Sequence, residues 1–570
     1  MATAVGLIGA LGETIWGMLL GGSILLLLFV FNLGIWRPYK LHAFYKKMRL
    51  ESPKHRPLLG NLPEIWKLKR QARGMKWEVD DPSRLAARSL PHLTLWSKLY
   101  GKMFTYTEGA KVNLCVLDTE IIKEMLEYKA DCYCRSSSGW LWLNSQAGSP
   151  HLKDQVLDTS IIHKDPEHWA TLRRTWGSMS EQDPAQGCLE MMVEISHILV
   201  RKWASSIKEC SVGSGGVHVD ARGDVTKVTM EMFLASLLGS TVSTDQLEAL
   251  GLDVCEEEDD DHLSFADLLR IPTISDLILS DHTHPSGCRS SRNGRIIRLL
   301  TETIESRLRF SNGKGQLQEK EGERKRDLLD LLMSTCGRLS SAQAVEKLVA
   351  DCRMLIAAQE ATSQLIAQTL QLLACHSEWQ ARARGELLDF RPLDLPGISE
   401  DGEQISNSYP NLAKLKIMNM ILNESLRLYP PILVTEKLCT KRHRLGKYKV
   451  LPGTSVQIPI VLLHHSTELW GDDALTFRPD RFAHGAASRR PFAFLPFSAG
   501  PSVCLGYNLA LQEAKIVLTS ILSSFSFEPV SDNLTPTCNR KPLLVRTLES
   551  DDFTSAAKHR VKLRQTSSPF

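Results

Sequence analysis

The sequence predicts one large domain of the α+β class, mainly α with a minor β-sheet. Its clearest helical stretch has no Gly or Pro from Ser341 to Arg384, and apolar residues recur there at spacings of three and four. Short β-branched runs, Val112 to Val116 and Ser455 to Ile458, predict a small sheet beside the helices. No long low-complexity linker divides the 570 residues, so we expect a single domain.

The N-terminus predicts a membrane anchor. Ile15 to Trp36 contains no charged residue and is long enough for a bilayer core of roughly 30 Å. A signal peptide is less consistent, because the run is long, only Glu13 precedes it as a charge, and no small-residue cleavage site follows. The next residues are basic, which predicts that they stay cytosolic. We expect residues 1–36 to be a single-pass anchor, 37–58 a basic, proline-containing linker and 59–548 the cytosolic domain.

The long helix carries a polar cluster in its middle. Ser340 and Gln343 form a capping box, and the helix is expected from about Ala342 to about Leu373. Its apolar stripe is interrupted by Gln359, Glu360, Thr362 and Ser363. Polar side chains in a core-spanning helix are costly unless they have a partner or a task, so this cluster is a candidate site.

A second candidate is Cys504, which follows a Gly-rich turn and precedes a helix. Such a position surrounds a thiolate with free backbone N–H groups and the positive end of a helix dipole, a setting that suits a metal-bound thiolate. A single Cys among apolar residues is more often a small buried hydrophobe. The other twelve cysteines show no paired metal-ligand spacing, and the odd total of 13 in the chain suits a reduced, cytosol-facing protein.

Three further patterns accompany this cysteine. Glu424 and Arg427 lie three residues apart on a helix ended by two prolines, so they share one face. A turn containing Arg481 follows, with the sequence Phe-Arg-Pro-Asp-Arg-Phe. Trp169 and Arg173 lie one helical turn apart.

The spacing F-x-x-G-x-x-x-C-x-G, formed by Phe497, Gly500, Cys504 and Gly506, strongly resembles the haem loop of the cytochrome P-450 family, the haem-thiolate monooxygenases. The last third of the chain looks like the plant clan that includes gibberellin, cytokinin and brassinosteroid hydroxylases. The resemblance implies the P-450 fold and a haem b (iron protoporphyrin IX) held by these four residues, with Cys504 as axial thiolate. One axial sulfur favours O–O cleavage, so this residue would decide the reaction class.

The other patterns also resemble motifs of the family. By that resemblance Glu424, Arg427 and Arg481 form a buried structural network that braces the haem loop, and Trp169 and Arg173 meet a haem propionate. Two positions depart from the family pattern. Ser502 stands where the family commonly has Arg, and Lys437 stands about where another Arg is expected, so we expect Arg173 to carry more of the anchoring.

The polar cluster of the long helix resembles the family pattern A-G-x-E-T-T with two departures. Ala358 replaces the Gly, which should narrow the oxygen groove, and Ala361 replaces the Thr, whose hydroxyl normally steers protons. Glu360 remains as the acid, and Thr362 is a candidate for the missing hydroxyl. We expect these positions to form the catalytic site, and we expect poor coupling with simple apolar substrates.

The resemblance implies an enzyme that inserts one oxygen atom from O2 into an apolar small molecule, terpenoid, steroid-like or hormone-related. NADPH would supply electrons through a flavoprotein reductase at the endoplasmic reticulum membrane. Two alternatives remain: a haem-thiolate isomerase or dehydratase that needs no reductase, and a weakly active ligand-binding member, suggested by Ala361, Ser502 and Lys437. The net charge of +3 gives no case for nucleic-acid binding, and residues 549–570 are expected to be a disordered tail.

Overall fold

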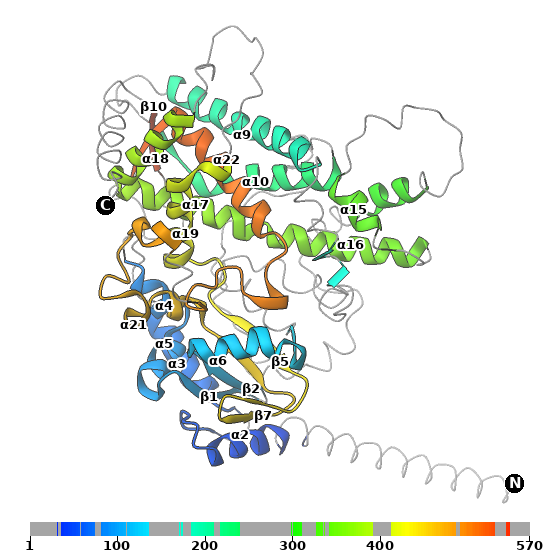
Figure 1. The fold of residues 1–570 in the computed structure, drawn as a ribbon, viewed down its shortest axis with the longest axis vertical. Helices are drawn as coiled ribbons and strands as arrows, with labels where there is room; N and C mark the ends of the chain where they lie inside the picture. The colour runs from blue at the N-terminus through cyan, green and yellow to red at the C-terminus, as the bar shows by residue number, and fades with distance from the viewer. Residues whose placement is uncertain are drawn as a thin grey trace, which may run out of the picture.

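A computed structural model of the chain describes most of the central and C-terminal elements and is mostly helical (Figure 1). The described segments are residues 36–56, 59–73, 81–109, 111–135, 184–209, 217–239, 300–309, 327–334, 341–390, 412–485, 491–529 and 543–547, with the isolated residues 31, 170, 171, 173, 174, 298 and 336. The prediction of a mainly helical chain with minor sheets is confirmed within these segments.

The N-terminal part of the molecule combines short helices with a five-stranded sheet in the order β1-β2-β8-β5-β3 (Figure 1). Its strands are β1 (Met103–Glu108), β2 (Lys111–Val116), β3 (Tyr133–Arg135), β5 (Thr435–Cys439) and β8 (Ser455–Ile458). Both expected strands are confirmed as β2 and β8, and they pair in parallel. Beside them lie α2 (Arg37–Lys47), α3 (Leu62–Arg73), α4 (Ser83–Ser89), α5 (Pro91–Tyr100), α6 (Thr119–Lys123), η2 (Glu124–Tyr128) and η3 (Ala130–Cys132).

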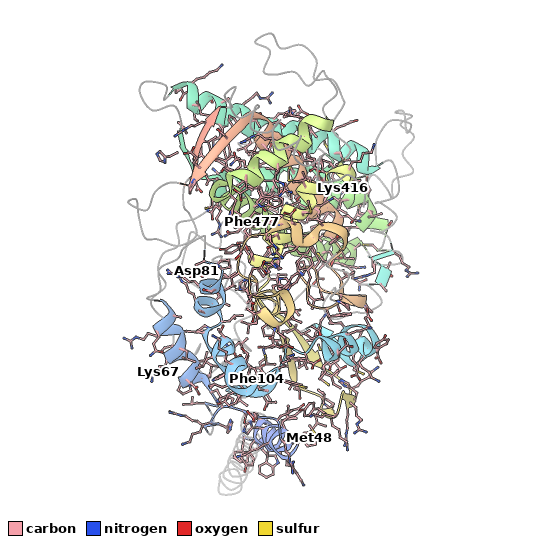
Figure 2. All side chains as sticks on the ribbon, turned by 60° about the vertical axis from the view of Figure 1, so that its left-hand side comes forward. Met48, Lys67, Asp81, Phe104, Lys416 and Phe477 are labelled. Carbon is pink, nitrogen blue, oxygen red and sulfur yellow. The ribbon has the colours of Figure 1, made fainter. Side chains whose placement is uncertain are left out.

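The helical part forms the other half of the molecule. In Figure 2 Phe104 marks the lower half, which contains the sheet, and Lys416 and Phe477 lie in the upper, helical half. Its long helices pack around α17, which contacts α10, α19 and α22. The helices are α9 (Pro184–Glu209), α10 (Ala221–Leu238), α15 (Leu328–Ser334), α16 (Ser341–Ala358), α17 (Glu360–Cys375), α18 (Ser377–Phe390), α19 (Lys416–Leu428) and α22 (Tyr507–Ser524).

Smaller elements complete the described fold. A three-stranded sheet in the order β4-β10-β9 closes the helical half, and β6 and β7 form a hairpin. Their bounds are β4 (Val217–Val219), β6 (His443–Leu445), β7 (Tyr448–Val450), β9 (Phe525–Pro529), β10 (Leu543–Thr547), η6 (Leu412–Lys414), α20 (Ile460–His464), α21 (Thr467–Trp470), η7 (Pro479–Gly485) and η8 (Gly500–Ser502).

The long helix departs from the sequence prediction in the middle of the polar cluster. The expected single helix is divided into α16 and α17 at Gln359, while Ser340, the expected cap, lies outside the described residues. Gln359 keeps a helical backbone (φ −62°, ψ −26°), but its N–H bonds the carbonyl of Ile356 and its own carbonyl accepts from Thr362 N at 3.0 Å. These i→i−3 bonds tighten the backbone locally, while Ser363 N also bonds the Gln359 carbonyl at 3.3 Å. The prediction of an unbroken helix is therefore wrong at this residue.

The predicted membrane anchor lies almost entirely outside the described residues, as does the predicted tail at 549–570. Within the part of the chain that the structure describes, no helix combines the length and apolar character needed to cross a bilayer. The first described helix, α2, starts directly after Trp36. Tyr45 fixes this helix to the domain, because its buried hydroxyl lies 2.6 Å from Thr454 Oγ1 and accepts a bond from Leu451 N.

Candidate functional site

Cys504 lies in a closed backbone loop that leads into α22, the orange helix of Figure 1. Its N–H donates to the carbonyl of Phe497 at 2.9 Å, and Val503 N donates to the carbonyl of Gly500 at 3.1 Å. The ring of Phe497 packs edge-on against Tyr507, the first residue of α22, with centroids 4.7 Å apart. The side chain of Cys504 is exposed, so a thiolate at the start of a helix is presented to a ligand.

The loop depends on glycine at Gly500. This residue has φ +62°, and a Cβ there would clash with the carbonyl oxygen of Leu126 in η2. Only glycine therefore fits both the backbone conformation and the close approach to η2. At Gly506 a Cβ would lie 4.0 Å from the Cys504 sulfur, which is an ordinary contact, so sterics within the described residues do not explain that glycine.

Two cations lie beside the cysteine although they come from distant parts of the chain. Arg173 Nη2 donates to the carbonyl of Val503 at 2.7 Å, and Lys437 Nζ donates to Ser502 Oγ at 2.7 Å. Burial lowers the pKa of Arg173, and the charge of Cys504 opposes that shift. Lys437 is only 6% exposed on β5. Trp169, the expected partner of Arg173, lies outside the described residues.

The contact between Lys437 and Ser502 was not anticipated from the sequence. Each residue departs separately from an expected arginine, and nothing in the sequence showed that the two departures meet. Together the exposed thiolate and the two nearby cations fit a haem, which needs one axial ligand and positive charge near its two propionates.

The half-exposed face of α17 carries the acid of the polar cluster. Glu360 and Ala361 are half-buried on this face, whereas Thr362 is only 5% exposed and lies with Ser363 on the buried face. Burial raises the pKa of Glu360, and Arg222 and Gln364 oppose that rise. Gln364 Nε2 donates to Glu360 Oε1 at 3.4 Å. Gln364 was missed from the sequence, although it stands one helical turn beyond Glu360.

The interruption at Gln359 is held by side chains from two other helices. Gln359 Nε2 donates to the carbonyl of Thr229 in α10 at 3.1 Å and to Glu513 Oε2 in α22 at 2.6 Å. Glu513 is fully buried, and burial raises its pKa to about 8 while the Gln359 amide lowers it. Its other carboxyl oxygen, Oε1, has no hydrogen-bond partner among the described residues. Glu513 was also missed from the sequence.

The residues of the predicted structural network do lie together. Arg427 binds Glu424 through two parallel bonds, Nε to Oε2 at 2.8 Å and Nη2 to Oε1 at 2.7 Å. Arg481 Nε reaches the same Glu424 Oε1 at 3.3 Å and its Nη1 bonds Asp473 at 2.8 Å. Glu424 and Arg427 are fully buried, and every member is charged and paired, which is the condition under which buried ions are tolerated.

A histidine links this network to the segment before the cysteine loop. Arg427 Nη1 donates to the carbonyl of His464 at 2.8 Å, and His464 Nε2 accepts from Leu495 N at 2.9 Å. Burial holds the pKa of His464 well below its usual value, so its ring stays neutral and can accept this bond. Leu495 in turn accepts from Ser498 N within the loop. The chain of bonds therefore runs from Arg427 to the loop of Cys504.

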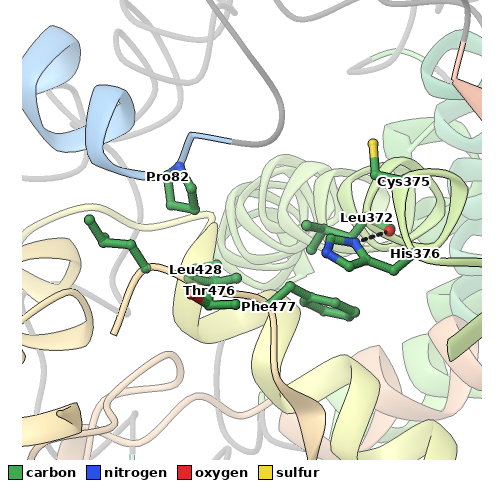
Figure 3. A pocket seen from close by; sticks show the side chains of 8 residues that line it. Pro82, Leu372, Cys375, His376, Leu428, Thr476 and Phe477 are labelled. Atoms are coloured by element: carbon green, nitrogen blue, oxygen red, sulfur yellow. Dashed lines mark hydrogen bonds between the residues drawn. The ribbon is translucent and has the colours of Figure 1, made fainter. Parts of the chain in front are cut away.

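A separate pocket of about 350 Å³ opens between α4, the end of α17 and the end of α19 (Figure 3). In it the ring of His376 is turned to the carbonyl of Leu372, which lies 2.8 Å from its Nδ1. None of the residues around Cys504 or Glu360 lines this pocket. We therefore assign it no part in the site.

Comparisons with known proteins identify the family. The family model described as Cytochrome P450 matches residues 87–553. Cytochrome P450 709B1 of Arabidopsis thaliana is 28% identical over 88% of this chain and 90% of its own length. A cytokinin hydroxylase of the same plant is 28% identical over 90% of this chain and 91% of its own, and CYP749A22 of Panax ginseng is 28% identical over 93% and 94%. The chain therefore belongs to the cytochrome P450 family of haem-thiolate monooxygenases.

Proposed function

We propose that this chain is a membrane-anchored monooxygenase in which Cys504 is the axial ligand of the haem. The observation that carries the proposal is the exposed thiol of Cys504 in a backbone loop closed by its own N–H and by Gly500. The substrate is an apolar small molecule of the terpenoid, steroid-like or hormone-related classes. Similarity to a relative named cytokinin hydroxylase supports the hormone-related class.

Haem, when bound, supplies the one-electron chemistry that activates O2. The described residues that would hold it are Cys504 as ligand, the loop residues Phe497, Gly500 and Gly506, and the two cations Arg173 and Lys437. Arg173 also bonds the loop carbonyl of Val503, and Lys437 is oriented by Ser502, so each cation is placed by the same loop that carries the thiolate. Trp169 is proposed as a further contact.

Protons reach the site from Glu360. Because burial raises the pKa of this carboxyl, it holds a proton more readily than an exposed glutamate. Ala361 offers no hydroxyl to pass that proton on, and Thr362 is directed to the buried face. The proton then passes through an ordered water held by Glu360 and Gln364, through Thr362 after a local change of the helix, or through a hydroxyl on the substrate.

Electrons come from NADPH through a flavoprotein reductase, and residues 1–36 anchor the chain in the endoplasmic reticulum membrane with the domain in the cytosol. The start of α2 supports an anchor that enters a membrane interface here. Trp36 and Tyr39 are 45% and 56% exposed, and Lys40 lies over the Trp36 ring at 4.8 Å from its centroid. Exposed aromatic rings with basic neighbours are typical of membrane–water interfaces.

The difference spectrum of the reduced protein with carbon monoxide tests the axial ligand. The wild type should show the Soret band of a thiolate-ligated haem, and Cys504→Ala should lose it. Cys134→Ala is the matched control, since Cys134 is a half-buried thiol on β3, outside the cysteine loop, and this variant should keep the band. A thiolate band in Cys504→Ala would show that another cysteine binds the iron.

The reaction class is tested with the reductase. Product that requires NADPH, reductase and O2 supports the monooxygenase, whereas turnover of an organic peroxide without NADPH supports the isomerase or dehydratase. The spectral shift of the haem, read across a panel of terpenoids, steroids and cytokinins, selects the substrate for this assay. Binding without turnover in either assay would support the weakly active ligand-binding protein.

A further inference from the structure

The junction of α16 and α17 is held by a carboxyl group that has no charged partner among the described residues. Glu513 is fully buried on α22, and its one hydrogen bond in the described structure comes from Gln359 Nε2, at 2.6 Å. The contrast with Glu424 is informative, because that equally buried carboxylate is paired with two arginines. A buried carboxylate without a cation is costly, and the usual outcome is that the group stays protonated.

Charged groups on the elements around α22 are engaged elsewhere. Lys515 of α22 donates to the carbonyl of Leu412 in η6, and Glu386 of α18 accepts from the first N–H groups of α19. Glu360 of α17 faces Arg222 of α10. Other charged groups on these elements include Arg384 of α18, which bonds carbonyls at the end of α22, and Glu231 of α10, which is buried. His197, Arg201 and Glu194 of α9 interact with one another, and Glu528 of β9 pairs with Arg546.

The position of Gln359 decides what its bond to Glu513 can do. The side-chain amide of Gln359 donates one hydrogen bond to the carbonyl of Thr229 in α10 and one to Glu513 in α22, so it fixes the tightened turn between two helices. Successive residues of a helix point about 100° apart. Holding Gln359 inward therefore directs Glu360 and Ala361 to the half-exposed face.

We propose that Glu513 is a positioning residue that holds the turn at Gln359 in place and thereby sets the direction of Glu360 and Ala361. This inference rests on the proposed function of Glu360 and Ala361 on the half-exposed face of α17. The role of Glu513 in holding the turn does not depend on which cysteine binds the iron. Ionisation of Glu513 weakens this hold on the turn. The hydrogen bond from Gln359 stabilises the ionised carboxylate, but the cost of burying the charge is larger. The ionised form is therefore solvated only when the turn opens and water enters.

The sign of the pH dependence follows from the direction of the shift. The pKa of Glu513 is raised to about 8 from an ordinary value of 4.5. The stability of the closed turn is thus greatest below about pH 4.5, and it falls as the pH rises from there to about 8. Linkage predicts that opening increases by about tenfold for each pH unit inside this window.

Hydrogen exchange of the full-length haem-loaded protein tests this role of Glu513. Amides 359–363 are followed at pH 6.0 and 7.5 and corrected for intrinsic exchange. Wild type should lose protection with rising pH. Glu513→Gln, which cannot ionise but can still accept from Gln359, should keep the pH 6.0 protection at both values. Glu513→Leu should be poorly protected at both.

Two comparisons make the outcome decisive. Glu386→Gln removes another buried carboxyl whose pKa is raised by burial, and it should leave the pH dependence at 359–363 intact. The infrared stretch of carbon monoxide on the reduced haem, at pH 6.0, should shift in Glu513→Leu and match wild type in Glu513→Gln. Equal pH dependence in wild type and Glu513→Gln, or an unshifted stretch in Glu513→Leu, would overturn the proposal.

Discussion

The network around Arg427 and the loop around Cys504 are connected by hydrogen bonds through His464, yet the two regions differ in how their charged side chains are paired and exposed. In the network the ion pair of Glu424 and Arg427 is fully buried, and the N–H groups of Arg427 donate to the carboxylate of Glu424 and to backbone carbonyls. In the loop the cysteine is exposed, Arg173 donates to the carbonyl of Val503, and Lys437 donates to the hydroxyl of Ser502.

The difference separates stability from ligand binding. Removing one partner of a buried ion pair destabilises the folded state, because the other charge is left buried without a partner or solvent. The cations of the loop are instead proposed to hold an anionic group of the cofactor. Variants in the network should therefore change unfolding, and variants in the loop should change what the protein holds.

The largest effect is expected for Arg427→Met, which leaves Glu424 buried with Arg481 as its remaining ion-pair partner in the described structure. Breaking a buried pair costs about 3–5 kcal/mol. The free energy of unfolding in guanidinium chloride measures it. Arg309→Met is the matched control, because the exposed Arg309 pairs with Glu305 at 3.0 Å, and a surface pair contributes about 0–1 kcal/mol. Equal losses in the two variants would remove the distinction between network and surface.

Gly500→Ala should come next, since it combines a left-handed backbone with a clash against the carbonyl of Leu126. We expect a loss of about 1–3 kcal/mol and a lower haem content per protein. The control is Gly101→Ala, where φ is +79° but no atom lies within 4 Å of the added Cβ, so only the backbone cost remains. Haem content, read from the Soret absorbance, should fall in the first variant and stay normal in the second.

Lys437→Met should release haem faster while changing unfolding of the apoprotein little. A hydrogen bond to a charged group contributes about 1.5–3 kcal/mol, so transfer of haem to apomyoglobin should accelerate about tenfold or more. Ser502→Ala should give a smaller acceleration, because the cation remains. Lys441→Met controls for the loss of a lysine, since Lys441 pairs with the exposed Asp131 at 3.4 Å. Haem release at the wild-type rate in Lys437→Met would place this lysine outside the cofactor site.

The smallest change is expected for Ala361→Thr, which restores a hydroxyl on the half-exposed face of α17. Product per NADPH with a hydroxyl-free substrate should rise by about threefold, a small part of the 10²–10⁴-fold range of general acid catalysis. Glu360→Ala should lower the same ratio with every substrate. Peroxide release measured beside product decides the matter, and tight coupling in the wild type would show that Ala361 is no handicap.

Features set by local sequence were predictable, and features set by distant partners were not. The strand at Ser455 to Ile458 and the helix that carries Glu424 follow from β-branched residues and from two terminating prolines. The fold class follows from the same patterns. The tightened turn at Gln359 could not be predicted from the residues around it, because its hydrogen-bond partners, Thr229 and Glu513, come from other helices.

The site shows the same division. The loop of Cys504 was predicted from its glycine and cysteine spacing, and the structure places Arg173 and Lys437 beside it. The bond between Lys437 and Ser502 joins residues 65 positions apart, and that between Arg173 and Val503 joins residues 330 apart. His464 was not predicted as the link, because a neutral buried ring acting as an acceptor has no signature in sequence.

The parallel pairing of β2 with β8 has a consequence for synthesis of the chain. Tyr106 of β1 and Gln457 of β8 hydrogen-bond although they are 351 positions apart. Ribosomes add about 5–20 residues per second, so β1 and β2 emerge on the order of tens of seconds before their neighbour exists. During that interval the edge of β2 is an open template for pairing with other chains. A transcript truncated before residue 455 would leave that edge uncovered for good, and its product should depend on chaperones to escape aggregation.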